Sequence, residues 1–382
     1  PAFTVLENRM PVSGLPCVVF VSIIYYIICI SPFLHKNPLI FSIYQKKWLK
    51  RCLCGAKCVL LSFLLRLYGM INRELIRLKL VQIIYSYYQN GSKNIEAAEK
   101  ELELSLSRAY KLYASLLSLM VEVGRMGLRM EEMRRNRARR LGLDDLGEGR
   151  FGRNRFIAQL ENNKQLLDYV ADQKISWADH ENFVRALYTQ IEESPIYEEY
   201  LKSEDSYASD REVWRKAYRQ FICNNDALDD ILEEMDIYWN DDKAIVDTFV
   251  LKTIKQFGEE SEETQPLQPE YRDEQDRTFA TRLLRNAIEG EATYLGMIAS
   301  TTRGWEINRV ALMDRIVMQL ALAEIISFPE IPVGVSINEY VELAKAYGSP
   351  KSGKYVNATL DNLSKQLIKE HKIVKNLPED VR

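Results

Sequence analysis

The stretch "NRVALMDRIVMQLALAEIISFPEIPVGVSINEYVELAK" at residues 308–345 decides the fold. Its first half is almost entirely apolar and has the length of a helix rather than of a strand, which predicts a helix over about 305–327. Pro329 and Pro332 then end that helix, because proline lacks the backbone N–H that a continuing helix needs. The stretch therefore predicts two apolar helices joined by a short proline-bearing connection.

The second helix is expected over residues 336–348. Ser336 and Glu339 form an S-x-x-E pattern before an apolar run, and in such a capping box each side chain satisfies a free backbone amide of the other residue. We therefore assign structural roles to these residues, and the motif alone does not make Asn338 or Glu339 functional.

The same helical spacing continues outward in both directions. No run of alternating β-branched residues and no strand–helix–strand rhythm occurs, so the fold class is all-α. Other helices are expected at about 71–89, 95–123, 157–175, 177–193, 208–223, 225–238, 241–257, 277–300 and 350–371.

The first 69 residues differ from the rest in charge and in cysteine content. They hold one acid, eight Lys/Arg residues and five of the six cysteines, whereas the other 313 residues carry a formal charge of −10. Cys223 is the one cysteine after Met70, so the main body has no internal disulfide, which fits a reducing cytoplasm. We interpret residues 1–69 as translated upstream sequence or a mis-set start, with Met70 as the native first residue.

A membrane anchor at residues 15–34 is the alternative for this segment. Its uncharged core, "CVVFVSIIYYIICI" at 17–30, is shorter than the roughly 20 residues that a membrane helix needs. Three cysteines in "CLCGAKC" (52–58) lack a fourth ligand at zinc spacing.

Two glycine-rich motifs resemble nucleotide-binding loops. "GEGRFG" (147–152) matches G-x-G-x-x-G but follows no strand, which favours a flexible loop. "GSPKSGKY" (348–355) is one residue short of a phosphate loop, because Tyr355 replaces the small hydroxyl that would hold Mg²⁺. The histidines after Met70, His180 and His371, lack companion ligands or bases. We therefore predict no catalytic residue, no cofactor and no metal.

Basic residues carry the stronger signal. Arg73 and Arg77 share one face of the first helix, and tyrosines including Tyr85 follow, a mixture suited to single-stranded RNA. The tract 125–156 holds ten arginines and is a stronger electrostatic candidate for binding RNA. The alternative interpretation is a segment that only keeps the protein soluble. Lys351, Ser352, Lys354 and Asn357 gather around a helix N-terminus, where backbone amides and charge suit phosphate or base contacts.

The C-terminal part resembles the NusB family of bacterial transcription antitermination factors. The matching pieces are Asp314-Arg315, Glu324, "IPVGVSINEYVELAK" (331–345) and "SGKYVNATLDNL" (352–363). "NRELIRLKLVQIIYSYYQ" (72–89) is similar to the first helix of the family, and "FATRLLRNAI" (279–288) to the helix that opens its second half.

This resemblance implies a NusB-like bundle of two small helical subdomains, enlarged by a helical insertion. The expected segments are the leader 1–69, a first helix 70–95, an insert 96–257, an acidic linker 258–276, a C-terminal subdomain 277–372 and a tail 373–382.

The function that the resemblance implies is non-enzymatic, cytoplasmic RNA binding. Family members hold boxA RNA of nascent ribosomal RNA leaders together with a small ribosomal protein, NusE, within the RNA polymerase antitermination complex. The residues at the motif positions, and hence the expected RNA contacts, are Arg73, Arg77, Tyr85, Arg282, Lys351, Ser352 and Lys354.

Two departures and two alternatives accompany this hypothesis. The family usually has an acid where Lys351 stands, and "YVNATL" replaces Phe-Val-Asn-Gly-Val-Leu. A NusB-like appendage of a ribosomal RNA methyltransferase would need a parallel-sheet domain with a glycine-rich cofactor loop. A membrane-anchored helical scaffold would need residues 15–34 to insert into a bilayer.

Overall fold

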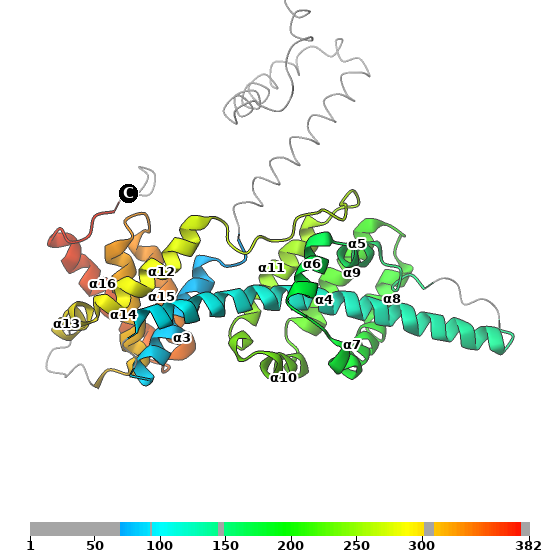
Figure 1. The fold of residues 1–382 in the computed structure, drawn as a ribbon, viewed down its shortest axis with the longest axis horizontal. Helices are drawn as coiled ribbons and strands as arrows, with labels where there is room; N and C mark the ends of the chain where they lie inside the picture. Colours follow the sequence, from blue (N-terminus) through cyan, green and yellow to red (C-terminus); the bar gives the residue numbers. More distant parts are fainter. Residues whose placement is uncertain (1–68, 92–93, 144–148, 302–308, 376–382) are drawn as a thin grey trace, which may run out of the picture. The chain divides into compact units, whose positions relative to one another are not determined.

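The computed structural model describes residues 69–91, 94–143, 149–301 and 309–375 (Figure 1). Across these ranges the chain forms fourteen α-helices and no strand beyond a single bridge between Ile71 and Tyr271. The all-α prediction is thus confirmed. Within the same ranges, no helix is long and apolar enough to cross a membrane. The candidate anchor at 15–34 and the cysteine cluster at 52–58 lie outside the described residues.

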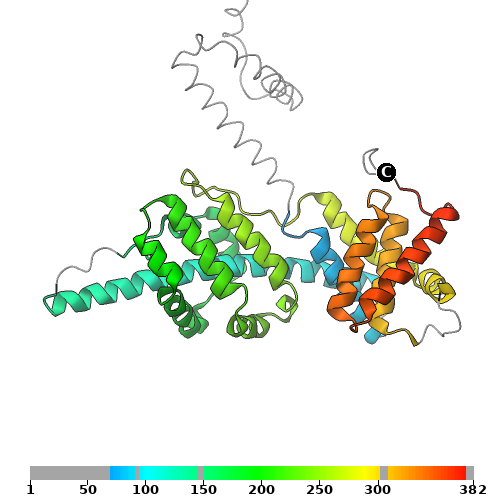
Figure 2. The same ribbon diagram turned by 180° about the vertical axis from the view of Figure 1, so that it is seen from behind.

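A bundle of six helices contains the stretch that decides the fold. Its central member, α14 (Leu312–Ser327), is buried along almost its whole length, as expected for a helix that is apolar all round. Its neighbours are α3 (Arg73–Gln89), α12 (Glu274–Glu289), α13 (Glu291–Thr301), α15 (Val333–Tyr347) and α16 (Ser352–Lys369). Figure 2 shows α15 and α16 lying side by side next to α14.

The first helix of the bundle is more deeply buried than its sequence indicates. Every residue of α3 from Leu75 to Val81 is buried, including Arg77 and Lys79. The helix packs against α4, α12 and α14 at once, so no basic face is left on the surface. Its two buried cations lie inside the fold, each paired with a carboxylate.

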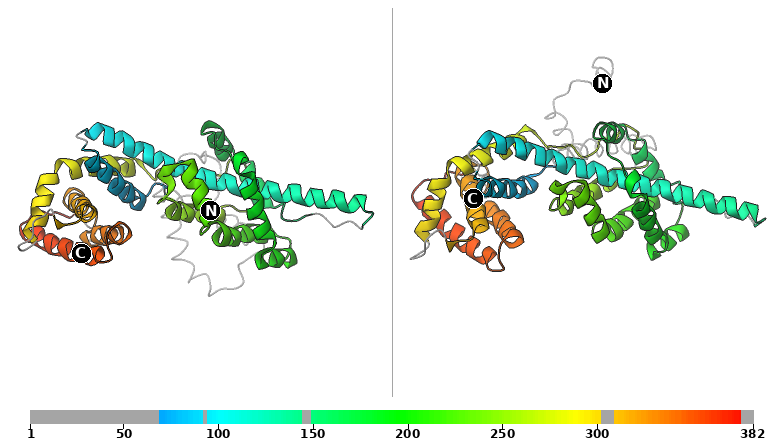
Figure 3. Two further views of the ribbon diagram at one scale, coloured as in Figure 1. Left: turned by 90° about the horizontal axis from the view of Figure 1, so that it is seen from below. Right: turned by 60° about the horizontal axis from the view of Figure 1, so that its bottom comes forward.

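Helix α4 (Ile95–Arg140) continues well past its expected end near residue 123. Its 46 residues span about 69 Å, and it runs from the bundle through the insert (Figure 3). Gly124 and Gly127 do not interrupt it. A Cβ atom at Gly124 would lie 2.7 Å from Ile157, and one at Gly127 would lie 3.0 Å from the rings of Phe151 and Tyr188. These glycines therefore let neighbouring chain segments approach α4 closely.

Gly124→Leu should consequently lower the free energy of unfolding by about 1–3 kcal/mol, because the new side chain overpacks the contact with Ile157. Gly296→Leu is the matched control, since a side chain at that helical position meets open space. It should leave stability unchanged or raise it by up to about 1 kcal/mol. Urea unfolding followed by circular dichroism measures both, and equal effects of the two substitutions would contradict this account.

The insert packs seven further helices along both halves of α4. Two helices that the sequence predicts as continuous are each divided into two, 157–175 at Asn162-Asn163 and 277–300 at Gly290. Helix α8 is not among the predicted helices, although Ser194 as N-cap and Pro195 at the first helical position are a common helix start. The insert helices are α5 (Arg155–Glu161), α6 (Lys164–Asp172), α7 (Glu181–Glu192), α8 (Pro195–Lys202), α9 (Tyr207–Ala217), α10 (Asp226–Met235) and α11 (Lys243–Gln256).

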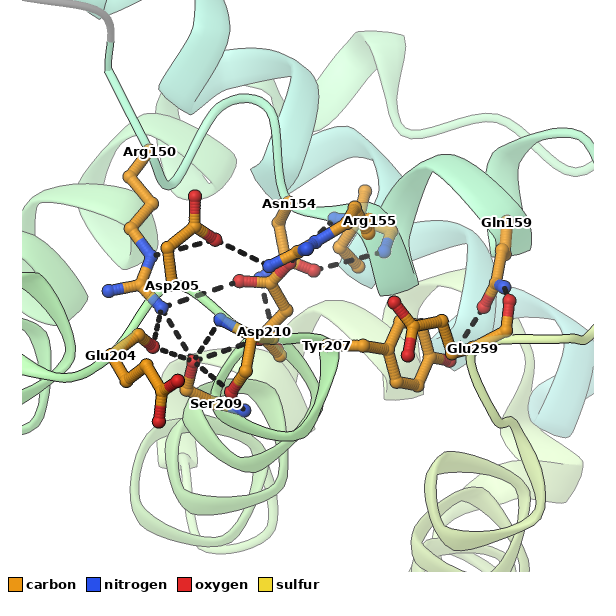
Figure 4. A network of polar contacts seen from close by, with 12 residues as sticks. Arg150, Asn154, Arg155, Gln159, Glu204, Asp205, Tyr207, Ser209, Asp210 and Glu259 are labelled. Atoms are coloured by element: carbon orange, nitrogen blue, oxygen red, sulfur yellow. Dashed lines mark hydrogen bonds and ion pairs between the residues drawn. The ribbon is translucent and has the colours of Figure 1, made fainter.

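The described part of "GEGRFG", residues 149–152, is a packed turn rather than a flexible loop. Phe151 is fully buried and stacks on Trp214. Arg150 donates hydrogen bonds to three backbone carbonyls, including that of Tyr200, and lies 4.1 Å from the Tyr200 ring. Figure 4 shows Arg150 beside Glu204 and Ser209, to which it also donates. The arginine thus fastens the loop to α8 and α9, a structural role that leaves no phosphate-binding cradle.

The predicted acidic linker is docked onto the fold. Leu267 and Gln268 are buried, and the Tyr110 hydroxyl donates to the Gln268 carbonyl at 3.0 Å. The backbone N–H of Met70 donates to the Pro269 carbonyl at 2.8 Å. Since α12 already begins at Glu274, the non-helical segment is shorter than expected and lies along α4 and the start of α3.

Candidate nucleic-acid interface

A buried ionic network joins three helices of the bundle. Arg77 of α3 donates two hydrogen bonds to Glu324 of α14, at 2.8 and 2.9 Å, and one to Glu339 of α15 at 3.1 Å. Glu324 is fully buried and also accepts from the hydroxyls of Ser336 and Tyr340. The four donors satisfy its carboxylate, so the network fixes how the three helices meet.

This network corrects two expectations. Arg77 is 4% exposed, so its guanidinium faces Glu324 and not a surface that RNA reaches. Burial lowers the pKa of Arg77, but the hydrogen bonds and charge of Glu324 outweigh that effect and raise it overall. The capping box is wrong as well: α15 begins at Val333, three residues before Ser336, whose hydroxyl points to Glu324 instead of capping the helix.

A second buried cation anchors α3 on the other side. Lys79 is fully buried, lies 2.8 Å from a carboxylate oxygen of Asp242, and donates to the Tyr238 carbonyl at 2.7 Å. Burial raises the pKa of Asp242 to about 6, against the lowering effect of Lys79. Local sequence patterns do not predict this pair, because its members are far apart along the chain.

Two predicted RNA contacts, Arg73 and Arg282, line the same groove between α3, α12 and α14. Arg73 lies 4.9 Å from the Phe279 ring and pairs with Asp276 at 3.3 Å. Arg282 is exposed and lies 4.9 Å from the Phe328 ring. Aromatic rings that lie beneath the two guanidinium groups hold these cations in place at the surface groove, where they can contact phosphates.

The two phenylalanines of this groove were not expected as site residues. Their rings pack edge to face with centroids 4.9 Å apart, and both are buried. They appear in the sequence as ordinary core residues at the start of one helix and the end of another. Only the folded bundle brings them beneath the two arginines.

The loop before α16 presents a separate basic surface. Lys351, Lys354 and Asn357 are exposed at the start of the helix. Ser352 is not: it is 1% exposed, and its hydroxyl oxygen accepts the Ser349 N–H at 2.8 Å. Ser352 therefore shapes the turn that holds the two lysines.

Tyr85 lies on the last half of α3 and is 39% exposed. Its hydroxyl oxygen accepts a hydrogen bond from Gln89 at 3.1 Å. Its neighbour Tyr88 is held differently, since its hydroxyl accepts from Gln319 of α14 at 2.7 Å. Of these two tyrosines, Tyr85 is the more exposed.

The groove of Arg73 and Arg282 and the groove of Lys351 thus lie at opposite ends of α14. Phe328 of the first groove follows the last residue of α14, whereas Asp314, in its first turn, lines a groove with Lys351. The 16 residues of α14 place these ends about 24 Å apart. A single strand that contacts both would cross the bundle surface.

Comparison with known proteins identifies the bundle. Residues 242–365 match the NusB family. The chain is 35% identical over 105 residues to the transcription antitermination protein NusB of Dictyoglomus thermophilum, which covers 28% of this chain and 70% of that protein. The chain belongs to the NusB family. The NusB of Pelotomaculum thermopropionicum is 40% identical over 85 residues, or 22% of this chain and 59% of that protein.

A solved structure of Thermotoga maritima NusB is 30% identical, covers 32% of this chain and 78% of its own, and superposes with a TM-score of 0.25. The NusB match begins at residue 242, inside the predicted insert 96–257, so that α11 lies within the family region.

Within the described residues, no group of three or more His, Cys, Asp or Glu side chains is arranged to hold a metal ion.

Proposed function

We propose that this protein is a non-enzymatic transcription antitermination factor that binds boxA-type single-stranded RNA of nascent ribosomal RNA leaders, together with the small ribosomal protein NusE. The observation that carries the proposal is the groove of the NusB region, where Arg73 and Arg282 lie over the rings of Phe279 and Phe328. In single-strand recognition cations contact phosphates, and here the two buried rings hold the guanidinium groups at the groove.

The exposure of each predicted contact indicates which role it would have in RNA binding. Arg282, Lys351 and Lys354 are exposed cations and would contact phosphates. Tyr85 would stack on a base, and Asn357 would donate to or accept from one. Arg73 is partly exposed and pairs with Asp276, so a phosphate would compete with that carboxylate. Arg77 and Ser352 are positioning residues, because they hold the helix and the turn that carry the others.

Arg282→Ala and Lys354→Ala should each weaken binding of a boxA-like RNA about five-fold at 0.1 M salt. This figure follows from the loss of one phosphate contact, which lowers the salt slope of a single-stranded complex by about 0.7. Fluorescence anisotropy with a boxA-like and a scrambled RNA, with and without the ribosomal protein, measures affinity and preference.

Arg285→Ala and Lys369→Ala are the matched controls. Each removes one exposed cation from the same helix as its partner variant, at a position outside the two grooves. The controls should bind like the unaltered protein. No preference for the boxA-like RNA, even with the ribosomal protein present, would refute the proposal.

A further inference from the structure

The last three turns of α4 project beyond the rest of the insert. In Figures 1 and 3 this end of the helix extends past α7 and α8 without a neighbouring helix. We call residues 132–143 the basic tip. Apart from Ala138, every side chain of the basic tip is exposed or partly exposed, including those of Met133, Leu141 and Leu143.

The basic tip concentrates positive charge that the fold does not neutralise. Of its five arginines, Arg134 pairs with Glu192 of α7. Arg137, Arg139 and Arg140 have no ion pair and no side-chain hydrogen bond within the part of the chain that the structure describes. Residues 125–156 as a whole hold ten arginines against five acids, in a protein whose formal charge is −3.

Folding alone does not account for these three arginines. Like charges three or four residues apart destabilise a helix by a few tenths of a kcal/mol per pair, as for Arg137 and Arg140. An exposed helix end also gains little from tertiary packing. The helix dipole favours cations at a C-terminus, but this effect is worth only about 0.3–1 kcal/mol and is screened by salt.

We infer that the basic tip is a second RNA-binding surface, which contacts the phosphate backbone of the transcript outside the boxA-binding grooves. The inference rests on the proposed function. Arginine suits this ligand because its planar guanidinium donates two parallel hydrogen bonds to one phosphate. The remainder of the chain is net negative, so an RNA strand that leaves the bundle is repelled by most of the insert and attracted by the tip.

The length of α4 determines how long an RNA must be to reach the basic tip from the bundle. Glu103 of α4 pairs with Arg277 of α12, which marks where the helix passes the bundle. From Glu103 to Arg139 the helix rises about 54 Å. A stacked strand with one phosphate per 3.4 Å needs about 16 nucleotides to cover this distance. A short RNA in the bundle grooves therefore does not reach the tip, whereas a long one does.

The test compares a 12-nucleotide boxA-like RNA with a 40-nucleotide RNA that extends it by an unstructured flank. The variant combines Arg137→Gln, Arg139→Gln and Arg140→Gln, which remove charge but keep helix propensity. It should bind the long RNA up to about 100-fold more weakly at 0.1 M salt, with a salt slope lower by about 2, from three contacts at about 0.7 each. Its affinity for the short RNA should equal that of the unaltered protein.

The control variant combines Arg185→Gln, Lys202→Gln and Arg219→Gln, which remove the same charge from exposed positions elsewhere in the insert. It should bind both RNAs like the unaltered protein, and equal melting temperatures establish that both variants fold. If the tip variant binds the long RNA with unaltered affinity and slope, the inference fails and an acidic protein becomes the candidate partner. Equal weakening for the short RNA overturns it too, whereas failure of the unaltered protein to bind either RNA refutes the proposed function instead.

Discussion

Glu324→Ala is expected to lower the free energy of unfolding by about 3–5 kcal/mol. The substitution leaves the Arg77 guanidinium buried with only the half-exposed Glu339 as partner, and it removes the acceptor of the Ser336 and Tyr340 hydroxyls. Removing one member of a buried ion pair is costly because the other charge stays out of water without compensation. Since α3, α14 and α15 meet at this carboxylate, urea unfolding should report the loss for the whole bundle.

Asp361→Ala is the matched control for this prediction. It also removes the carboxylate of an ion pair, but the Asp361–Lys365 pair is exposed. Its loss should therefore lower the free energy of unfolding by no more than about 0.5 kcal/mol. Replacing both partners of the buried pair, by Arg77→Met with Glu324→Leu, should restore a large part of the lost stability because no buried charge remains. A cost below about 1 kcal/mol for Glu324→Ala would show that the network does not hold the bundle together.

Lys79→Met is expected to destabilise the protein by about 3–5 kcal/mol at pH 8 and by much less at pH 5. The methionine fills the space of the lysine stem, but it leaves Asp242 buried without its cation. At pH 8 that carboxylate is ionised inside the fold. At pH 5 it is protonated, and a neutral carboxyl group costs far less to bury.

The sign of this pH dependence follows from the direction of the pKa shift. The pKa of Asp242 is already raised to about 6 in the unaltered protein, and removing Lys79 takes away an influence that lowers it. An unfolded aspartate titrates near 3.9, so between these values the native state binds the extra proton. Stability therefore falls as pH rises through the native pKa, which is opposite to the usual behaviour of a salt-bridged aspartate.

Urea unfolding of Lys79→Met at several pH values between 5 and 8 measures this effect. Adding Asp242→Asn provides the control, because the double variant has no titrating group at this position. Its free energy of unfolding should lack the fall between pH 5 and pH 8 that the single variant shows. A pH-independent loss in the single variant would mean that packing of the lysine stem, rather than the charge of Asp242, accounts for the destabilisation.

Much of the NusB region was evident from the sequence because its signals are local. Apolar spacing predicted α3 and α14, the prolines at 329 and 332 marked the end of α14, and the motif around Ser352–Leu363 indicated the family. These features depend on residues within one or two helical turns of each other, where backbone geometry alone relates them.

The sites of the buried charges were beyond such reasoning. Ser336 and Glu339 have the spacing of a capping box, yet both serve the Arg77–Glu324 network, because a helix start is decided by what the first turn packs against. Arg77 was predicted to be a surface cation because helical spacing shows which residues share a face of α3, but not which other helices cover that face. Only packing against two further helices reveals that this face is enclosed.

The sequence by itself therefore determined the helical class, the family of the C-terminal bundle and the residue types available for RNA. The tertiary structure decided which cations reach solvent, that Gly124 and Gly127 admit neighbours instead of ending α4, and that Arg137, Arg139 and Arg140 of the arginine tract lie on an exposed helix end. The physical reason is that exposure and ion pairing are properties of contacts between segments up to 262 residues apart, which local spacing does not encode.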